Sequence, residues 1–526
     1  MTRAREDDRR ARPIARHVLA AACAIAAAAA AAPASAQDMR GSVRATANYI
    51  ELVPLEQDTV DRDQVVEDEN GRLTFDGRPV TCVLVERCTF YHDGDVVSGA
   101  ALTQDVSVTA WGFGVEGLSA TALARTRQDI GGEFTVPRSN DAFDLLLGYA
   151  ELARERWRAR VGRMRTLSGL GFSGYDGAEV MVRPLAALRI EGYAGRSLAP
   201  GLEESRESAL DPIEAFVPDQ SSWLFGAALG WEAAERTSVE LRYQRDLLGD
   251  RSVLLSERAS IDVRSSWLRA LTVEASADYD VALSTVGKAR LALVHPITRT
   301  ITVQATARRY LPYFELWTIW GYFSPVAYHE AELDAAWTVA PGVHVQGGIG
   351  WRAYEDHDAP VVFEPLKDDA LRARIGAVLT RGAWTASAEY RTEGPAGAFM
   401  HGGDAEVRWR ALDQLEVGAQ LSATQQIMEL RLGDERIVGA GLIARWQATA
   451  RALVAGGASL YAHQLEGRPS TGDWSQTRAW AAVEIGFGTE PELLDDVVPA
   501  APLPENYWPA TEAEEDAADA ATEGTR

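Results

Sequence analysis

Cysteine and long hydrophobic runs are scarce in this chain. Its 526 residues include 3 Cys, of which only Cys82 and Cys88 lie beyond residue 36. In an oxidising compartment these two predict a local disulfide that holds a loop, and two free thiols are the alternative. Beyond residue 36 no run reaches the roughly 18 apolar residues of a membrane helix, which excludes a transmembrane α-helix there.

Recognisable catalytic and cofactor motifs are also missing. The histidines are scattered, without HExxH, GxSxG, P-loop or dinucleotide-binding patterns. Asp356, His357 and Asp358 form a triplet in an expected loop, where solvation is a better interpretation than catalysis. The acidic run at residues 58–69 does not match the spacing of a calcium loop. We therefore expect no enzyme activity, no bound metal and no cofactor.

The N-terminal segment has the pattern of a secretory signal. Six Arg residues within positions 3–16 precede an Ala-dominated run at 18–32, and a small-x-small pattern ends at Ala36. The sequence thus predicts a cleavable signal peptide at residues 1–36. Its removal changes the formal charge from −24 to −27, because six Arg and three acidic residues leave. A chain this acidic is a poor partner for nucleic acid.

Residues 371–423 alternate strictly between apolar and polar side chains. Leu371, Ala373 and Ile375, for example, interleave with Arg372 and Arg374. This period of two places one apolar and one polar face on each strand. A soluble antiparallel sheet would bury the apolar face in a core, whereas an outer-membrane barrel would turn it to lipid and enclose the polar face.

The positions of the aromatic residues favour the barrel. Trp384, Tyr390 and Trp409 occupy the apolar face toward expected strand ends, where a bilayer interface holds aromatic rings. The rest of that face is rich in Ala and Gly, which makes a poor packed core but an acceptable wall toward lipid. We expect an all-β, single, antiparallel up-and-down transmembrane barrel.

The same alternation recurs from residue 43 to residue 487 in 22 segments, with 18 to 24 strands as the accepted range. Short connections such as 116–117 and 341–342 alternate with long ones such as 54–103 and 198–219. This predicts short periplasmic turns, long outer loops and a barrel at residues 37–488. The long polar segment from residue 54 to about 98 is expected to be a solvated outer loop.

Residues 489–526 are rich in Glu, Asp, Ala and Pro, and predict a disordered acidic tail. Phe487 is the candidate for the terminal aromatic residue that the barrel-insertion machinery reads, although the tail follows it. The tail would then extend into the periplasm and could meet a partner there.

Charged residues on the polar faces are the candidates for a pore lining. They would serve as a charge-screening wall or only as cross-strand ion pairs. We expect basic and acidic strands to form separate arcs, and a bulge at Gly162 to return Arg163 and Arg165 to the lumen. The candidates are Arg158, Arg160, Arg163, Arg183, Arg242, Arg290, Arg308, Arg372, Arg374, Arg408, Arg410, Glu274, Asp278, Glu330, Glu332 and Asp334.

An aromatic segment at residues 313–325 is a candidate for a constriction or a sugar-stacking surface, and an aromatic cap on neighbouring loops is the slightly favoured alternative. Trp317, Trp320 and Tyr322 would be unfavourable in water, so the segment should pack either into the lumen or as a cap on neighbouring loops.

Residues 161–178 resemble a recurring hairpin of bacterial porin-like barrels, most nearly the alginate-export-type family. The likeness lies in VGRMRTL at 161–167, the Gly-rich stretch 169–174 and YDGA at 175–178, with Met164 in place of the usual Gln. The resemblance implies an outer-membrane barrel that passes anionic polysaccharide or other small solutes.

The sequence therefore predicts an outer-membrane channel, embedded in lipid, for small hydrophilic solutes, among them anionic or saccharide ones. A plugged structural or adhesion barrel that acts through its outer loops is the alternative. An outer-membrane hydrolase is a third hypothesis.

Overall fold

The structure is a computed structural model that describes residues 38–53, 55–67, 73–76, 78–82, 87–132, 143–198, 222–232, 236–249, 253–268, 271–311, 327–355, 369–394, 400–427, 434–466 and 474–488. The segments predicted as signal peptide and acidic tail lie outside this part of the chain, as do Trp317, Trp320 and Tyr322.

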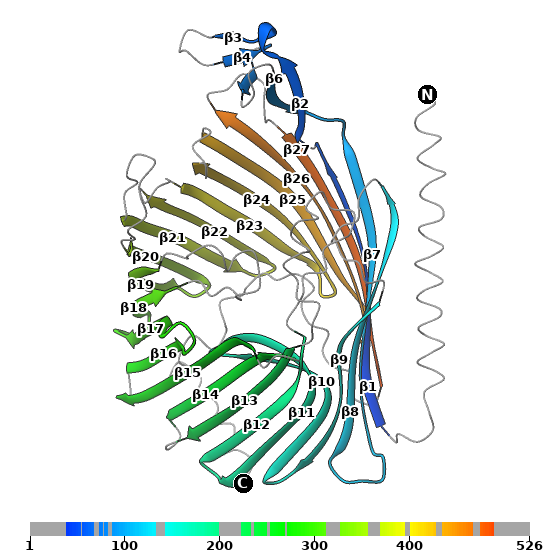
Figure 1. Ribbon diagram of the computed structural model, residues 1–526, viewed down its shortest axis with the longest axis vertical. Coiled ribbons are helices and arrows are strands. Elements are labelled where there is room, and N and C mark those ends of the chain that lie inside the picture. Colours follow the sequence, from blue (N-terminus) through cyan, green and yellow to red (C-terminus); the bar gives the residue numbers. More distant parts are fainter. Residues whose placement is uncertain are drawn as a thin grey trace.

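Twenty-two antiparallel strands form one closed sheet (Figure 1). Each strand pairs with its neighbours in sequence, and β1 closes the ring by pairing with both β7 and β27. The up-and-down barrel and its strand number are thereby confirmed. The strands are β1 (Asp38–Leu52), β7 (Val97–Trp111), β8 (Leu118–Gly132), β9 (Phe143–Arg154), β10 (Trp157–Ser168), β11 (Gly171–Leu185), β12 (Leu188–Ser197), β13 (Ser222–Glu232), β14 (Thr237–Leu248), β15 (Val253–Leu268), β16 (Leu271–Asp280), β17 (Thr285–Pro296), β18 (Ile301–Tyr310), β19 (Tyr328–Ala340), β20 (Val343–Tyr354), β21 (Asp369–Arg381), β22 (Trp384–Gly394), β23 (Met400–Leu412), β24 (Leu415–Ile427), β25 (Asp434–Thr449), β26 (Ala452–Glu466) and β27 (Trp474–Gly488).

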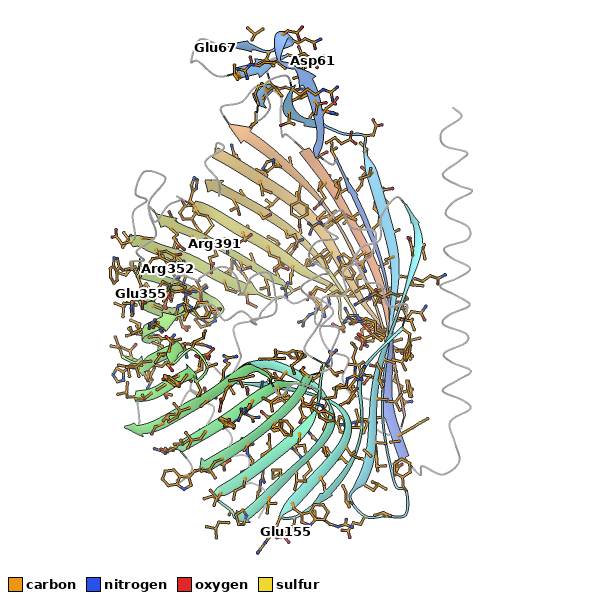
Figure 2. All side chains as sticks on the ribbon, viewed as in Figure 1. Asp61, Glu67, Glu155, Arg352, Glu355 and Arg391 are labelled. Atoms are coloured by element: carbon orange, nitrogen blue, oxygen red, sulfur yellow. A yellow bond between two sulfur atoms is a disulfide. The ribbon has the colours of Figure 1, made fainter. Side chains whose placement is uncertain are left out.

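The two ends of the barrel differ in the length of their connections. Two residues join β9 to β10, β11 to β12, β19 to β20 and β21 to β22, all at the end where β1 begins and β27 ends. Figure 2 shows the two ends: the label Glu155 marks one of these turns, and the label Asp61 lies beyond the opposite end. Because barrels of this kind keep their short turns in the periplasm, the end with short turns is the periplasmic end.

The connection between β1 and β7 is a folded insert rather than the solvated loop expected from its polarity. A small five-stranded antiparallel sheet of β2 (Leu55–Asp61), β6 (Arg87–Asp93), β5 (Arg78–Thr81), β4 (Leu73–Phe75) and β3 (Val66–Glu67) stands on the outer end. Val60, Cys88 and Phe90 are its buried centre. Cys82 and Cys88 form the predicted disulfide, with 4.1 Å between their Cα atoms. The cross-link and the apolar centre both stabilise this small sheet.

The outward face of the barrel is apolar and carries two rings of aromatic side chains. Exposed Trp residues follow or precede the short turns on several strands, and exposed Trp and Tyr residues recur toward the other end of the strands. No helix among the described residues is long and apolar enough to cross a membrane. The inner ring, toward the periplasmic end, is Trp157, Trp231, Trp337, Trp384, Trp409 and Trp446, and the outer ring, toward the opposite end, includes Trp223, Tyr243, Tyr279, Trp351 and Tyr390.

These rings and the apolar face between them decide between a soluble antiparallel sheet and an outer-membrane barrel, which the alternation of apolar and polar residues left open. Ile375 and Leu371 are exposed by 60% and 65%, so the apolar faces do not meet one another in a core. A closed barrel with such an exterior is the form in which strands cross a bilayer, because every backbone group in it is paired. The protein is an outer-membrane barrel.

Candidate functional site

The inward face of the wall carries charged side chains of both signs. All the predicted lining residues except Arg163 occupy the strand face opposite the exposed apolar one. Strand alternation is enough to place them there, since the side chains of consecutive residues point to opposite faces.

Glu330 on β19 is the centre of the densest cluster. Its side chain is 2% exposed and lies 2.7 Å from Arg308, 2.9 Å from Arg352 and 2.8 Å from Arg372. Glu393 binds Arg352 and Arg372 at 2.8 and 2.9 Å. Five strands from β18 to β22 are thereby connected across the inner surface by ion pairs.

A second cluster repeats this pattern on the other side of the barrel. Glu179 and Glu151 bind Arg158 and Arg160 between β9, β10 and β11. Arg242 of β14 is almost fully buried between Glu191 and Glu240, at 3.3 and 3.1 Å. Carboxylate and guanidinium groups are thus paired across this part of the wall as well.

The expectation of separate acidic and basic arcs is wrong. Glu274 of the acidic strand β16 faces Arg290 of β17 at 3.4 Å, and Asp334 of β19 faces Arg374 of β21 at 2.8 Å. Strands that differ in sign lie next to or near one another, so that many inward charges are stabilised by an opposite charge on another strand. The wall therefore has no large region of one sign along these strands.

Arg163 lies on the opposite face from the other candidates. The pairing of β10 with β11 runs through Gly162 without a register shift, so no bulge changes the alternation. Arg163 shares a face with Val161, which is 60% exposed, and it binds Asp176 through two bonds of 2.7 and 2.8 Å. The prediction that Gly162 returns Arg163 to the lumen is thus wrong.

The β10–β11 hairpin leaves the wall at this level. Strand β10 pairs with β9 only as far as Arg163, and β11 pairs with β12 only from Tyr175 onward. Beyond these points, residues 164–168 and 171–174 form strand ladders only with each other.

A row of glycines permits the bend. Gly162, Gly177 and Gly195 are direct neighbours on β10, β11 and β12. A Cβ on Gly162 would collide with the Gly148 carbonyl, and a Cβ on Gly177 with the Ala194 carbonyl. Gly162 also has φ 131°, a conformation that other residues rarely adopt. On the lumen side Met164, Tyr175, Tyr193 and Leu224 pack into a buried cluster that supports the base of the hairpin.

The tip of the hairpin reaches across the lumen to β15. Arg258 donates from Nη1 to the Leu170 carbonyl at 2.9 Å and from Nη2 to Asp278 at 2.6 Å. Gly169 lies directly against the side chains of Ser260 and Asp262, so a Cβ there would collide with them. Leu170 is buried in this contact. The hairpin therefore narrows the lumen, and it is the constriction within the described residues.

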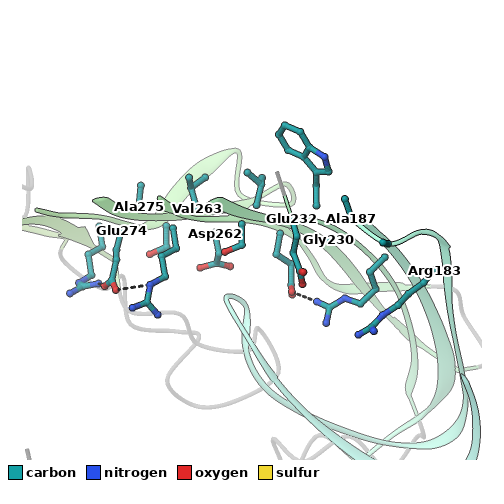
Figure 3. A pocket seen from close by; sticks show the side chains of 17 residues that line it. Arg183, Ala187, Gly230, Glu232, Asp262, Val263, Glu274 and Ala275 are labelled. Carbon is teal, nitrogen blue, oxygen red and sulfur yellow. Dashed lines mark hydrogen bonds and ion pairs between the residues drawn. The ribbon is translucent and has the colours of Figure 1, made fainter. Parts of the chain in front are cut away.

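A pocket of about 460 Å³ lies on the lumen wall next to this contact, between β11 and β17. In Figure 3, Arg183, Asp262 and Glu274 point into it, whereas Val263 and Ala275 point to the other side of the sheet. Asp262 both lines the pocket and touches Gly169 of the hairpin. Arg183 has no ion-pair partner among the described residues, which leaves its guanidinium available to a solute.

The constriction could not be located from the sequence, although its residues were noticed. The Gly-rich stretch 169–174 contributes only to the resemblance, and the apolar density of Trp317, Trp320 and Tyr322 makes these residues the candidates for a constriction or a loop cap. The useful signal was the connection itself: residues 169–170 are a two-residue connection at the end of the barrel where the long connections lie.

Within the described residues no group of three or more His, Cys, Asp or Glu side chains is arranged to hold a metal ion. The inner wall can order water and attract or repel solute charges. Its exposed guanidinium groups, above all Arg183, can also bind carboxylate or phosphate oxygens in bidentate fashion.

Comparison with known proteins finds similar solved structures but no matching family. No protein-family model matches it, and no curated protein matches it in sequence. Similar solved structures include the siderophore receptor PirA from Pseudomonas aeruginosa, with 13% identity and a TM-score of 0.47 over 85% of this chain and 80% of that one. OccK3 (OpdO) from the same organism has 9% identity and a TM-score of 0.37 over 87% and 97% of the two chains.

A BenF-like porin from Pseudomonas fluorescens Pf-5 is similar at 8% identity, with a TM-score of 0.36 over 86% of this chain and 100% of that one. The assignment of the barrel rests on the strand pairing of this chain itself.

Proposed function

We propose that the protein is an outer-membrane channel through which small hydrophilic solutes diffuse. The observation that carries the proposal is a closed barrel of 22 strands. Its exterior is apolar with two rings of aromatic side chains, and its interior is charged. A wall that was only structural would gain little from charged side chains, since ion pairs on a water-filled surface contribute about 1 kcal/mol or less.

Anionic and saccharide solutes are the proposed substrate class. Guanidinium groups that remain partly exposed along the wall support this class, among them Arg374 at 45% and Arg391 at 47%. Their fork geometry suits carboxylate groups. The resemblance of residues 161–178 to the alginate-export-type family points in the same direction. The paired carboxylates make the expected preference for anions weak.

The remaining parts of the chain fit this proposal. We infer export by the signal peptide at residues 1–36, insertion by the machinery that assembles barrels, and a periplasmic partner for the acidic tail at 489–526. Phe487 lies on β27 and pairs with Gly41 of β1, so the aromatic residue proposed as the insertion signal stands at the closing seam of the barrel.

Single-channel recording tests the proposal. Mature protein reconstituted in a planar bilayer should produce stepwise conductance in potassium chloride. A salt gradient should give a small reversal potential of the sign for anion preference, and Arg183→Gln should reduce it, because this residue faces the pocket without a carboxylate partner. Absence of conductance from protein that retains heat-modifiable migration would contradict the channel.

A surface role is the second candidate, and the folded insert favours it. A disulfide-linked sheet on the outer end carries Val66, whose side chain is exposed by 66%. Silence in the bilayer together with retained barrel migration would support this adhesion or structural role instead.

A further inference from the structure

The inward hairpin leaves a strand edge of the wall without a partner. Residues 143–147 of β9 lie beyond the last pair with β10, Gly148 with Arg163, and within the described residues they join only β8. Arg163 donates from Nη1 to the Leu145 carbonyl at 2.9 Å and so satisfies one acceptor of this edge. Above that level, no β10 or β11 ladder connects β9 to β12.

An apolar groove lies at the same place on the outside of the barrel. Its volume is about 660 Å³, and it runs from Leu145 past Arg163 and Asp176 to Trp223 and Phe225. Trp223 belongs to the outer aromatic ring, so the groove lies at the level where the outer leaflet meets water. Half of its lining residues are glycine or alanine, whose small side chains leave a depression between the larger ones.

One face of the hairpin continues from this groove into the lumen. Val161, Arg163, Arg165 and Leu167 succeed one another on that face of β10, and Phe172 lies directly opposite Leu167. Leu167 is 82% exposed and Phe172 is 64% exposed. Large apolar side chains inside a polar lumen are unfavourable in water, so their exposure indicates an apolar ligand.

The charge on this face indicates the sign of the charge that the ligand carries. The Arg165 guanidinium lies 5.6 Å from the centre of the Phe172 ring and has no carboxylate partner among the described residues. Arg163, in contrast, is neutralised by Asp176. A molecule that followed this face would therefore meet apolar contacts and one unneutralised cation.

We propose that the inward hairpin opens a side passage by which an amphiphile with an anionic head and an apolar chain moves between the outer leaflet and the lumen. Its chemical class is a long-chain carboxylate. The chain contacts the groove, Leu167 and Phe172, and the head binds Arg165. The proposal rests on the proposed channel function, because the passage leads into the channel lumen. The contacts of the amphiphile with the groove and the hairpin do not depend on whether the barrel conducts ions.

Labelling of an introduced cysteine tests the passage without any current. Leu167→Cys reports on the hairpin face, and Ser387→Cys on the inward face of β22 is the matched control. The natural cysteines beyond residue 36 are held in the disulfide. N-dodecylmaleimide dissolved in the bilayer should label Leu167→Cys about tenfold faster than Ser387→Cys. Equal rates would overturn the proposal.

Blocking the groove from outside distinguishes a side route from entry at the mouth. Ala194 is exposed and lines the groove, so Ala194→Trp fills it without touching the lumen. This substitution should lower the labelling of Leu167→Cys by N-dodecylmaleimide to the control rate. Labelling by a water-soluble sulfonated maleimide should remain unchanged. An unchanged rate with N-dodecylmaleimide would contradict the side passage. Ala178→Phe provides a second filled groove if the first variant does not fold.

Protection by dodecanoate tests the role of Arg165. Dodecanoate should slow the reaction of Leu167→Cys with the water-soluble reagent, whereas dodecyl maltoside, which is neutral, should not. Arg165→Gln should weaken the protection about fivefold or more, as expected for loss of one charge-assisted contact. Equal protection by the two amphiphiles would overturn recognition of the anionic head. Failure of conductance with successful labelling would contradict the channel alone.

Discussion

At the scale of single residues, the burial of an ion pair decides how much it contributes to the stability of the barrel. Glu330 is almost fully enclosed by three guanidinium groups, whereas Glu406 binds Arg408 on its own strand with both side chains about a quarter or more exposed. Charges that water screens contribute little to stability, but a buried acceptor whose removal leaves several cations facing one another contributes more.

Glu330→Gln should therefore destabilise the barrel by about 2–3 kcal/mol, somewhat less than the roughly 3–5 kcal/mol for breaking a fully buried pair, because its arginine partners remain partly exposed. Glu406→Gln should cost less than about 1 kcal/mol. Urea unfolding of both variants in lipid vesicles measures the difference. Similar losses for the two would show that burial of Glu330 does not matter.

At the scale of elements, the β10–β11 hairpin shows how one bend changes the role of two strands. On the periplasmic side of the glycine row the two strands form part of the barrel wall. On the outer side of the row they cross the lumen and reach Arg258. The tip is held by few contacts, chiefly the bond from Arg258 to the Leu170 carbonyl and the packing of Gly169 on β15. Loss of that bond should release the tip while the wall persists.

Arg258→Gln should raise the unitary conductance and make the current fluctuate, since the tip no longer rests on β15. Arg264→Gln changes the same face of the same strand at a residue 71% exposed, and should leave the conductance unchanged. Asp278→Asn removes the same ion pair but keeps the bond to Leu170, so it separates the two effects. Conductance that rises equally in Asp278→Asn would assign the effect to the ion pair.

At the scale of the whole molecule, two solvents act on the two faces of one sheet. Lipid contacts the apolar face and water the charged face, and a single closed ring keeps them apart. A charge introduced on the lipid face should therefore destabilise the protein more than the same charge on the inward face of a neighbouring strand.

Ile375→Arg places a charge on the lipid face of β21 and should destabilise the protein by about 2–4 kcal/mol, as found for arginine near the middle of a bilayer. Ser387→Arg places the same charge on the inward face of β22 and should change the stability by about 1 kcal/mol or less. Unfolding in lipid vesicles compares them. An equal effect would argue against a membrane-exposed Ile375.

What the sequence determined by itself is the barrel and the two faces of its wall. A period of two is local, so Leu371, Arg372 and their successors already specify which side of the strand each side chain occupies. The regular alternation of short and long connections added the strand number and the up-and-down order. The pair Cys82 and Cys88 was close enough in sequence to predict its disulfide.

Only the tertiary structure decided which charges meet and where the lumen narrows. Glu330 binds Arg308, Arg352 and Arg372 because β18 to β21 are adjacent, and no local pattern gives distances across strands. Arg163 lies outside because the ladder continues unshifted through Gly162. The hairpin turns inward because three glycines align on neighbouring strands, and that alignment depends on register, which the barrel as a whole sets.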